Sequence, residues 1–337
     1  MTTITIPSLS QHVQAFFGNY LTSQRAMSPN TVLSYRDTFK LFLSFAARHR
    51  QKAVAALNFD DVGPDTVLAF LDDVEKQRRC SVRTRNARLA ALHTFFRYVA
   101  EREPVVLDTC QRVNAIPVKK TRIPTPVYLA HDEVIHILRS IDRSTTLGRR
   151  DHLLVHLLYE TGARAQEIAA LRTTALRLSA PYQARILGKG RKERICPLRA
   201  TTATLIRQFL RNKGVADDED VSLFVGPRGD TLTRYGILRA VQRRVRQAAA
   251  SLPTLASKRI GAHTFRHSAA VHLLRSGNDL TVIRSWLGHV SITTTDHYTE
   301  IDLEMKKRAL EASEPAPTPG RSSWKKDPDL LAWLEAL

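Results

Sequence analysis

The sequence is poor in cysteine. Its 337 residues include only three cysteines, at positions 80, 110 and 196, and no two of them form a Cys-x-x-Cys pair. Disulfide scaffolds and structural zinc sites need more cysteines at closer spacing. A His-Glu-x-x-His motif and a Gly-x4-Gly-Lys-Ser/Thr phosphate loop are missing as well. The sequence therefore predicts no disulfide framework, no metal site, and no nucleotide or other cofactor.

Long apolar runs are also missing. No stretch approaches the ~18 residues that a membrane span needs. Residues 1–10 lack the cationic start and apolar stretch of a secretory signal. We expect a soluble protein in the reducing environment of the cytoplasm.

Acidic residues are scarce relative to basic ones. Lys and Arg number 51 against 32 Asp and Glu, a net charge of +19. Residues 1–125 carry +8 (18 − 10), and residues 225–275 carry +9 (10 − 1). Such an excess favours a polyanionic partner, of which nucleic acid is the commonest. Hydrophobic and charged contents of 43% and 25% are typical of a globular protein.

The length and the sequence pattern predict two domains. Residues 8–105 form the first, which we expect to be helical. Ser28-Pro29 is typical of a helix start, and further helices are predicted at 64–76 and 81–100. A proline-containing basic linker is predicted at 106–126.

Several basic residues are candidates for contact with a phosphate backbone. Some lie in the predicted helix 81–100, opposite its apolar face, some in the linker, and two in the basic window 225–275. A solvated basic face is the ordinary alternative. The candidates are Arg83, Arg85, Arg88, Lys119, Lys120, Arg122, Arg243 and Arg244.

Residues 127–312 form the predicted second domain, of mixed α/β but mostly helical structure. A helix is expected near 131–140, and strands at 182–187 and 194–198 predict a hairpin around Gly188–Lys192. Residues 313–337 read as a tether followed by a short helix at 327–337 with an apolar stripe. A helix of this length is unstable alone, so it needs a surface to dock on.

Four islands of the second domain carry side chains suited to chemistry. The first holds Arg164 and Glu167, which share a helix face at i,i+3. The second is the hairpin turn with Lys189, and the third holds His263 and Arg266. The fourth is Leu287-Gly288-His289, followed by Tyr298. Each island alone has an ordinary explanation, such as a surface ion pair, a turn, helix residues or a core aromatic.

Taken in order, the islands closely resemble the tyrosine recombinase (phage integrase) family. The resemblance covers roughly residues 8 to 310, with two departures: Gln166 stands where Ser is frequent in the family, and Phe265 where Leu is frequent. It implies a mainly α fold, with a helical, SAM-like core-binding domain before the catalytic domain. The catalytic residues that it implies are Arg164, Lys189, His263, Arg266, His289 and Tyr298.

The resemblance implies DNA cleavage and religation through a 3′-phosphotyrosyl bond on Tyr298. Arg164 and Arg266 would hold the phosphate, because a guanidinium binds two oxygens and stays charged. His289 would donate a further hydrogen bond, and Glu167 would support the arginine and the histidines. His263 is the candidate proton acceptor. Lys189 is the candidate general acid, with Lys192 as the alternative.

The expected partner is double-stranded DNA at a specific site, bound by a homotetramer with one dimer on each site. The two domains would clamp the duplex, and helix 327–337 would dock on a neighbouring subunit or on its own. We therefore expect the protein to act in the bacterial cytoplasm, on the nucleoid. Two alternatives stay open: a type IB topoisomerase or protelomerase, revealed by relaxation without a site, and a catalytically silent DNA-binding regulator, revealed by the absence of covalent adducts.

Overall fold

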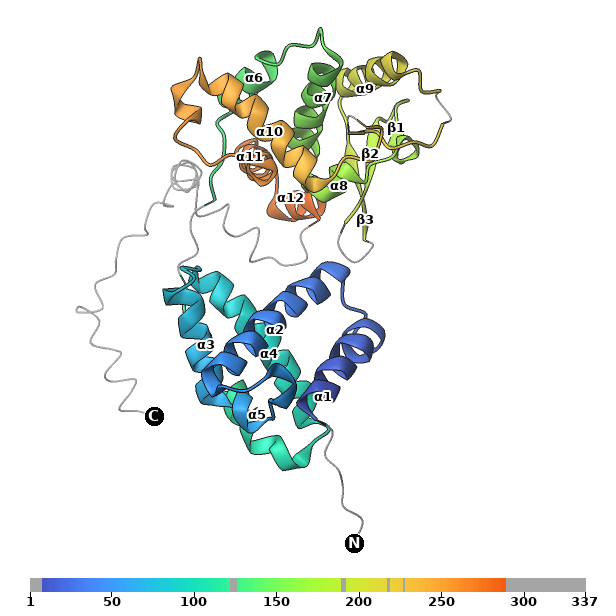
Figure 1. Cartoon of the computed structure of the whole chain (residues 1–337). Helices are drawn as coiled ribbons and strands as arrows, with labels where there is room; N and C mark the ends of the chain where they lie inside the picture. The colour runs from blue at the N-terminus through green and yellow to red at the C-terminus, as the bar shows by residue number, and fades with distance from the viewer. Residues whose placement is uncertain (1–7, 122–125, 189–191, 217–218, 227, 289–337) are drawn as a thin grey trace, which may run out of the picture. The chain divides into compact units, whose positions relative to one another are not determined.

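The computed structural model describes residues 8–121, 126–188, 192–216, 219–226 and 228–288 of the chain. The chain divides into two units, residues 1–123 and 124–337 (Figure 1). The first unit thus extends well past residue 105, where the first domain was predicted to end. No helix within the described ranges is both long and apolar enough to cross a membrane.

The first unit is helical throughout its described residues. Ser28 caps its longest helix by accepting a hydrogen bond from the Thr31 amide, with Pro29 in the first turn, so the predicted helix start is confirmed. The predicted helices at 64–76 and 81–100 are confirmed too. The elements are α1 (Leu9–Ala15), the π-helix η1 (Phe16–Gln24), α2 (Pro29–Arg50), η2 (Val54–Ala56), η3 (Asp60–Val62), α3 (Pro64–Lys76), α4 (Val82–Ala100), η4 (Pro104–Val106) and α5 (Leu107–Asn114).

Phenylalanine rings dominate the core of this unit. Phe95 of α4 meets the rings of Phe16 and Phe39 edge-on, at centroid distances of 5.2 and 5.1 Å. Aromatic pairs favour this geometry. Phe42 and Phe70 bring α2 and α3 into the same core. The helices are thus held by contacts between residues far apart in the sequence.

Helix α5 corrects the predicted linker. Residues 107–114 were assigned to a linker at 106–126, but they form a helix that packs against α4 and α3 and buries Cys110 and Val113. Pro104 opens a 3-10 turn before this helix and Pro117 follows it. The prolines therefore bracket a helix, a position that proline tolerates, and do not prevent one.

The second unit is mixed α/β and mostly helical, as predicted. Its helix α7 packs against α9, α10 and α11, and Figure 1 shows it between α10 and α11 on one side and α9 with the sheet on the other. The elements are α6 (His131–Arg139), α7 (Thr146–Thr161), α8 (Ala165–Ala169), η5 (Thr173–Ala175), β1 (Leu176–Arg177), β2 (Gln183–Leu187), β3 (Glu193–Pro197), α9 (Ala200–Lys213), α10 (Arg234–Ala249), η7 (Pro253–Leu255), α11 (Ala262–Arg275) and α12 (Leu280–Leu287).

The sheet is small and antiparallel, in the order β1-β2-β3. Strands β2 and β3 form the predicted hairpin, with Ala184 opposite Cys196 and Ile186 opposite Arg194. The short strand β1 was not predicted. Ala184, Ile186 and Cys196 are buried, so the face that they share with Arg194 is the inner face of the sheet.

Candidate active site

The first predicted island lies where α7 ends and α8 begins. Arg164 is the N-cap of α8, and Glu167 is the third residue of that helix. The Glu167 carboxylate accepts a hydrogen bond from the Arg164 amide at 2.9 Å and another from Arg164 Nη1 at 2.8 Å. The side chain of Glu167 is 5% exposed and that of Arg164 is 33% exposed. A buried carboxylate thus orients a guanidinium that reaches solvent.

Gly162 makes this corner possible. It ends α7 with a left-handed φ of 59°. A Cβ at this position would lie 2.4 Å from Leu287 Cδ2, where no atom fits. The end of α12 therefore comes directly against the end of α7, and both the backbone angle and the close contact require glycine.

Arg266 of α11 joins these two helix ends. Its Nη1 donates to the Gly162 carbonyl at 2.6 Å and its Nη2 to the Leu287 carbonyl at 2.7 Å. The residue is 2% exposed. The last carbonyls of a helix lack partners within the helix, so a guanidinium placed there satisfies and fixes them.

His263 lies one turn before Arg266 on α11 and remains exposed. Partial desolvation of its ring, together with the nearby cations Arg266 and Arg164, lowers its pKa. At neutral pH the imidazole is therefore uncharged, which is the form that accepts a proton.

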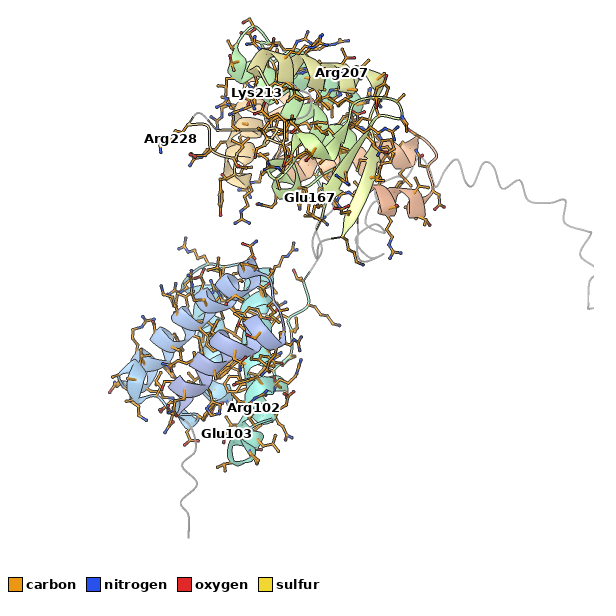
Figure 2. The ribbon with its side chains drawn as sticks, turned by 90° about the vertical axis from the view of Figure 1, so that its right-hand side faces the viewer. Arg102, Glu103, Glu167, Arg207, Lys213 and Arg228 are labelled. Atoms are coloured by element: carbon orange, nitrogen blue, oxygen red, sulfur yellow. The ribbon has the colours of Figure 1, made fainter. Side chains whose placement is uncertain are left out.

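The β2-β3 turn reaches the same corner. Gly188 donates its amide to the Lys192 carbonyl at 2.8 Å, which closes the described ends of the turn. A Cβ on Gly188 would lie 3.5 Å from Glu167 Oε1. Figure 2 shows Glu167 beside the strands of this hairpin. The predicted general acid Lys189 is outside the described residues, and Lys192 is exposed.

Arg194 of β3 was not singled out from the sequence. Its Nη2 donates to Glu167 Oε2 at 2.6 Å and its Nε to the Trp286 carbonyl at 2.9 Å. Burial would raise the pKa of Glu167, but the hydrogen bonds from Arg194 and from the Arg164 amide hold it below its usual value. A signal was available: Arg194, Cys196 and Leu198 alternate along the predicted strand 194–198, and an arginine on the inner face of a strand needs a buried partner.

Two further predicted residues, His289 and Tyr298, lie outside the described residues, as does Arg122. The chain reaches His289 from Gly288, which ends α12 in the left-handed conformation. A Cβ on Gly288 would lie 3.1 Å from Arg194 Cδ. The described structure thus gathers Arg164, His263 and Arg266 with the residues that flank Lys189 and His289.

The predicted DNA-binding residues fall into two groups. Arg83, Lys119 and Lys120 are exposed, and Arg88 is half-buried. Arg85 and Arg244 are 4% and 6% exposed. Arg85 was expected opposite the apolar face of α4. Its placement there was wrong, because the spacing Arg85, Leu89, Leu92 and Phe96 puts it on that face.

Both buried arginines have partners within their own unit. Arg85 donates to the Pro117 carbonyl at 3.2 Å and lies 3.8 Å from Glu75. Arg244 Nε and Arg243 Nη2 donate to the fully buried carboxylate of Asp151 at 2.8 and 2.6 Å. These contacts support the fold, and Arg243 keeps a side chain that is 40% exposed.

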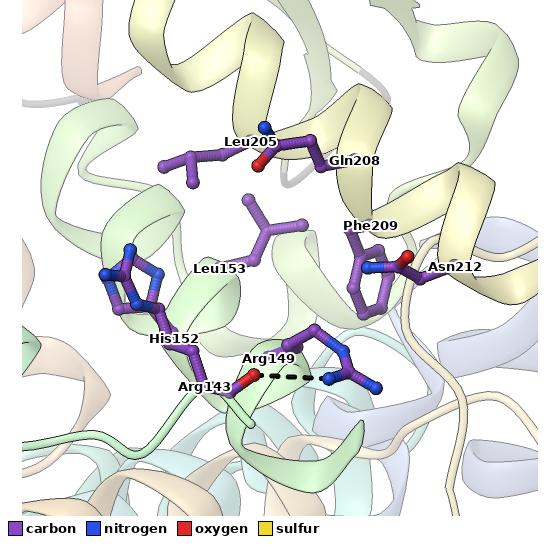
Figure 3. A pocket seen from close by; sticks show the side chains of 8 residues that line it. All are labelled: Arg143, Arg149, His152, Leu153, Leu205, Gln208, Phe209 and Asn212. Atoms are coloured by element: carbon purple, nitrogen blue, oxygen red, sulfur yellow. Dashed lines mark hydrogen bonds between the residues drawn. The ribbon is translucent and has the colours of Figure 1, made fainter. Parts of the chain in front are cut away.

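A cavity of about 240 Å³ lies elsewhere, between α7 and α9. Figure 3 shows Leu153 and Phe209 facing it, with Arg149 held by the Arg143 carbonyl at its edge. Of the predicted catalytic residues that the structure describes, none lines it, and Arg164 and Arg266 lie at the other end of α7. Within the described ranges, no three His, Cys, Asp or Glu side chains are placed to hold a metal ion.

Comparison with known proteins identifies the family of the chain. The model of the phage integrase family matches residues 127–305, and that of the phage integrase N-terminal SAM-like domain matches residues 14–103. The chain belongs to the phage integrase family. It is a tyrosine-type site-specific DNA recombinase, and the topoisomerase and silent-regulator alternatives are not favoured.

Its relatives match over nearly their full length. The predicted integrase/recombinase y4rC of Sinorhizobium fredii (strain NBRC 101917 / NGR234) is 40% identical over 98% of both chains. The tyrosine recombinase XerC of Pelobacter propionicus (strain DSM 2379 / NBRC 103807 / OttBd1) is 30% identical over 91% of this chain and 96% of its own. The fold is similar to that of the XerH recombinase bound to difH, with a TM-score of 0.67, 23% identity, and coverage of 85% of this chain and 81% of that one.

Proposed function

We propose that this recombinase cuts and rejoins duplex DNA through a covalent 3′-phosphotyrosyl bond on Tyr298. One observation carries the proposal. Arg164, at the start of α8, lies near His263 and Arg266 of α11 and pairs with the buried carboxylate of Glu167, beside the residues that flank Lys189 and His289. This is the arrangement that attack on a phosphodiester requires.

Two fixed guanidiniums stabilise the transition state. The pentacoordinate phosphorus carries extra negative charge, and planar forks on Arg164 and Arg266 match its oxygens. Arg164 offers the more exposed group, and Arg266 is held deeper by its two carbonyl contacts. His289 donates one more hydrogen bond to the phosphate.

Proton transfers complete the reaction. The Tyr298 phenol has an ordinary pKa near ~10 and must lose its proton as it attacks. Neutral His263 takes that proton, directly or through a phosphate oxygen. Lys189 gives a proton to the departing 5′-oxygen, with Lys192 as the alternative donor. A 5′-hydroxyl reverses the step, so religation consumes no ATP, and cleavage proceeds in excess EDTA.

The DNA contacts are proposed for the basic residues that reach solvent: Arg83, Arg88, Lys119, Lys120, Arg122 and Arg243. Contacts to phosphates supply most of the affinity of such complexes. Arg85 and Arg244 act indirectly, through the folds that they support. We place the reaction in the bacterial cytoplasm, on nucleoid DNA, since the curated relatives are bacterial.

Strand exchange is proposed to take place in a homotetramer, with one dimer on each site. A lambda integrase tetramer bound to a Holliday junction shares this fold, with a TM-score of 0.61 over 88% of this chain, 78% of that one and 15% identity. Helix 327–337 is proposed to dock on the neighbouring subunit. Deleting residues 314–337 should spare half-site binding and weaken synapsis. Synapsis equal to that of the full chain would contradict docking in trans.

The experiment that tests the chemistry first finds the DNA site. The full chain is mixed with a library of random duplexes or fragmented genomic DNA, and SDS-resistant adducts are recovered and sequenced. A nicked suicide duplex of that sequence is then cut by the wild type and by Tyr298→Phe. The variant should bind this DNA normally and form no adduct. An adduct that survives the substitution shows that another residue is the nucleophile.

A further inference from the structure

Arg194 joins three elements of the proposed catalytic site. Strand β3, which carries it, is one arm of the hairpin around Lys189. Its Nη2 binds Glu167, the carboxylate that orients Arg164, and its Nε binds the Trp286 carbonyl at the end of α12. We propose that Arg194 is a positioning residue that fixes the lysine hairpin, the Arg164–Glu167 pair and the end of α12 relative to one another. The proposal rests on the function proposed above.

The burial of Arg194 needs a reason beyond stability. Its side chain is 9% exposed, and its partner Glu167 is 5% exposed. Desolvating such a pair costs about as much as the pair returns, and apolar residues of similar size often serve stability as well or better. What an apolar residue cannot supply is direction. A guanidinium with its Nε on one partner and its Nη2 on another holds both at fixed angles.

A second side chain of β3 reinforces the same contact. Cys196 lies two residues on, on the same inner face, with its Sγ 3.7 Å from the Trp286 carbonyl and 3.9 Å from the Thr161 carbonyl. Arg194 and Cys196 therefore both reach the end of α12. This attachment fixes the strand against the helix end, and with it the base of the turn that carries Lys189.

The end of α12 is held by two guanidiniums on consecutive carbonyls. Arg194 takes the Trp286 carbonyl and Arg266 the Leu287 carbonyl. Gly288 then turns the chain toward His289 against the Arg194 side chain, which leaves little room for a Cβ. The direction in which the chain leaves α12 thus depends on Arg194.

Loss of Arg194 should therefore slow catalysis and spare DNA binding. It would release Arg164, Lys189 and His289 together, while the exposed basic residues remain in place. In metal sites, losing a hydrogen-bond partner that orients a ligand costs on the order of 10–100-fold in affinity or activity, and we expect a similar cost here. Arg194→Gln should reduce the cleavage rate by that factor. The cleavage rate of Arg194→Lys should lie between those of Arg194→Gln and the wild type, because one ammonium cannot hold both Glu167 and the Trp286 carbonyl.

The test measures adduct formation on the nicked suicide duplex under single-turnover, DNA-saturating conditions. DNA affinity and thermal stability are measured on the same preparations. Arg185→Gln is the matched control, since Arg185 is an exposed arginine on the adjacent strand β2. The control should cleave like the wild type. Arg194→Gln and Arg194→Lys should cleave slowly with unchanged Kd. Wild-type rates in both variants, or losses that only follow a loss of folded protein or of DNA affinity, would overturn the positioning role.

A double-mutant cycle gives a readout that simple destabilisation does not produce. Glu167→Gln and Arg194→Lys should each slow cleavage, and the double variant should be little slower than the worse single variant, because both act on Arg164 through one contact. Losses that multiply would refute the link through Glu167. If the wild type forms no adduct on Tyr298, the proposed function itself fails, which this series shows separately.

Discussion

Arg85 in the first unit and Arg266 in the second are buried almost equally, at 4% and 2% exposed. Arg85 contacts a carbonyl beyond the end of α5 and a carboxylate of α3, so it ties one helical unit together. Arg266 donates to the carbonyl of Gly162, which ends α7, and to the carbonyl of Leu287, the last residue of α12. Burial alone therefore does not mark a functional arginine. Arg266 differs in that its two partners lie at helix ends. The chain continues from these ends to the predicted catalytic residues Arg164 and His289.

After the complete loss of cleavage expected of Tyr298→Phe, the largest effect is expected at Lys189. Lys189→Ala removes the proposed proton donor, so cleavage should slow by ~10²–10⁴-fold. A 5′-bridging phosphorothiolate, whose sulfur leaves without protonation, should restore the rate. Single-turnover cleavage of the oxygen and sulfur duplexes measures this. Equal rescue of Arg266→Lys would show that the effect is not specific to the leaving group. If Lys192→Ala were rescued instead, the acid would be Lys192.

Substituting each arginine by lysine tests the distinction between Arg266 and Arg85. Arg266→Lys should slow cleavage by ~10²–10³-fold, because an ammonium cannot reproduce the fork. Arg85→Lys should cut DNA at a near-normal rate per folded molecule and lower the Tm. Adduct kinetics and thermal melts on both variants decide it. A catalytic loss at Arg85 as large as that at Arg266 would end the distinction.

Two helix ends in the second unit, at Gly162 and Gly214, allow a further comparison. Gly162 and Gly214 both end helices with left-handed backbone, at φ of 59° and 67°, but only Gly162 is crowded by Leu287. Gly214→Ala should cost the strain of that backbone alone, about 1–2 kcal/mol. Gly162→Ala should cost about 1–3 kcal/mol more through overpacking, and should slow cleavage by displacing α12. Urea unfolding gives both values, and equal costs would contradict the crowding.

The two units should also respond differently to acid. Burial lowers the pKa of His152, His267 and His272 in the second unit to about 4. In the unfolded chain these groups titrate near ~6.5, so below that pH the unfolded state binds more protons and stability falls toward pH 4. The first unit has one such group, His93, whose pKa burial lowers as well.

Hydrogen exchange of the full chain at pH 7 and pH 5, corrected for intrinsic rates, separates the units. Peptides within 128–288 should lose more protection than peptides within 9–116. The carboxylates with lowered pKa, such as Glu160, stay ionised in this range and do not contribute. An equal or larger loss in the first unit would contradict the histidine explanation.

The smallest effect concerns a helix end of the first unit. Helix α2 ends with Gln51 in the left-handed region at φ 50°, where the second unit uses glycine. Gln51→Gly should relieve about 1 kcal/mol of strain, partly offset by the entropy of glycine in the unfolded chain. We expect a Tm equal to or slightly above that of the wild type. A clear drop in Tm would show that the Gln51 side chain itself contributes.

Local signals allowed part of this structure to be predicted. Ser28-Pro29 specified a helix start, and the strands around Gly188 specified a hairpin, because both depend on neighbouring residues. The failures depended on distant partners. Helix α5 is stable because α3 and α4 cover Cys110 and Val113. It was not predicted because the nearby prolines indicated a linker. Arg85 was wrongly expected to face solvent because of its charge, although its spacing from Leu89 and Leu92 puts it on the apolar face of α4.

The candidate site shows the same division. The order of the motifs pointed to Arg164, Glu167, His263 and Arg266, which the structure gathers. Arg194 was missed because its role depends on Glu167 and the Trp286 carbonyl, 27 and 92 residues away in the sequence. Lys189, His289 and Tyr298 stay predictions of the sequence.

The end of α12 has an electrostatic consequence. A helix carries roughly half a negative charge at its C-terminus, which repels an approaching phosphate. Here the last two carbonyls of α12 are each covered by a guanidinium, from Arg194 and from Arg266. The guanidiniums of Arg164, Arg194 and Arg266 outweigh the Glu167 carboxylate and the half negative charge of the helix end, so the local potential is positive. A helix end that would otherwise repel the phosphates of DNA thus becomes attractive to them.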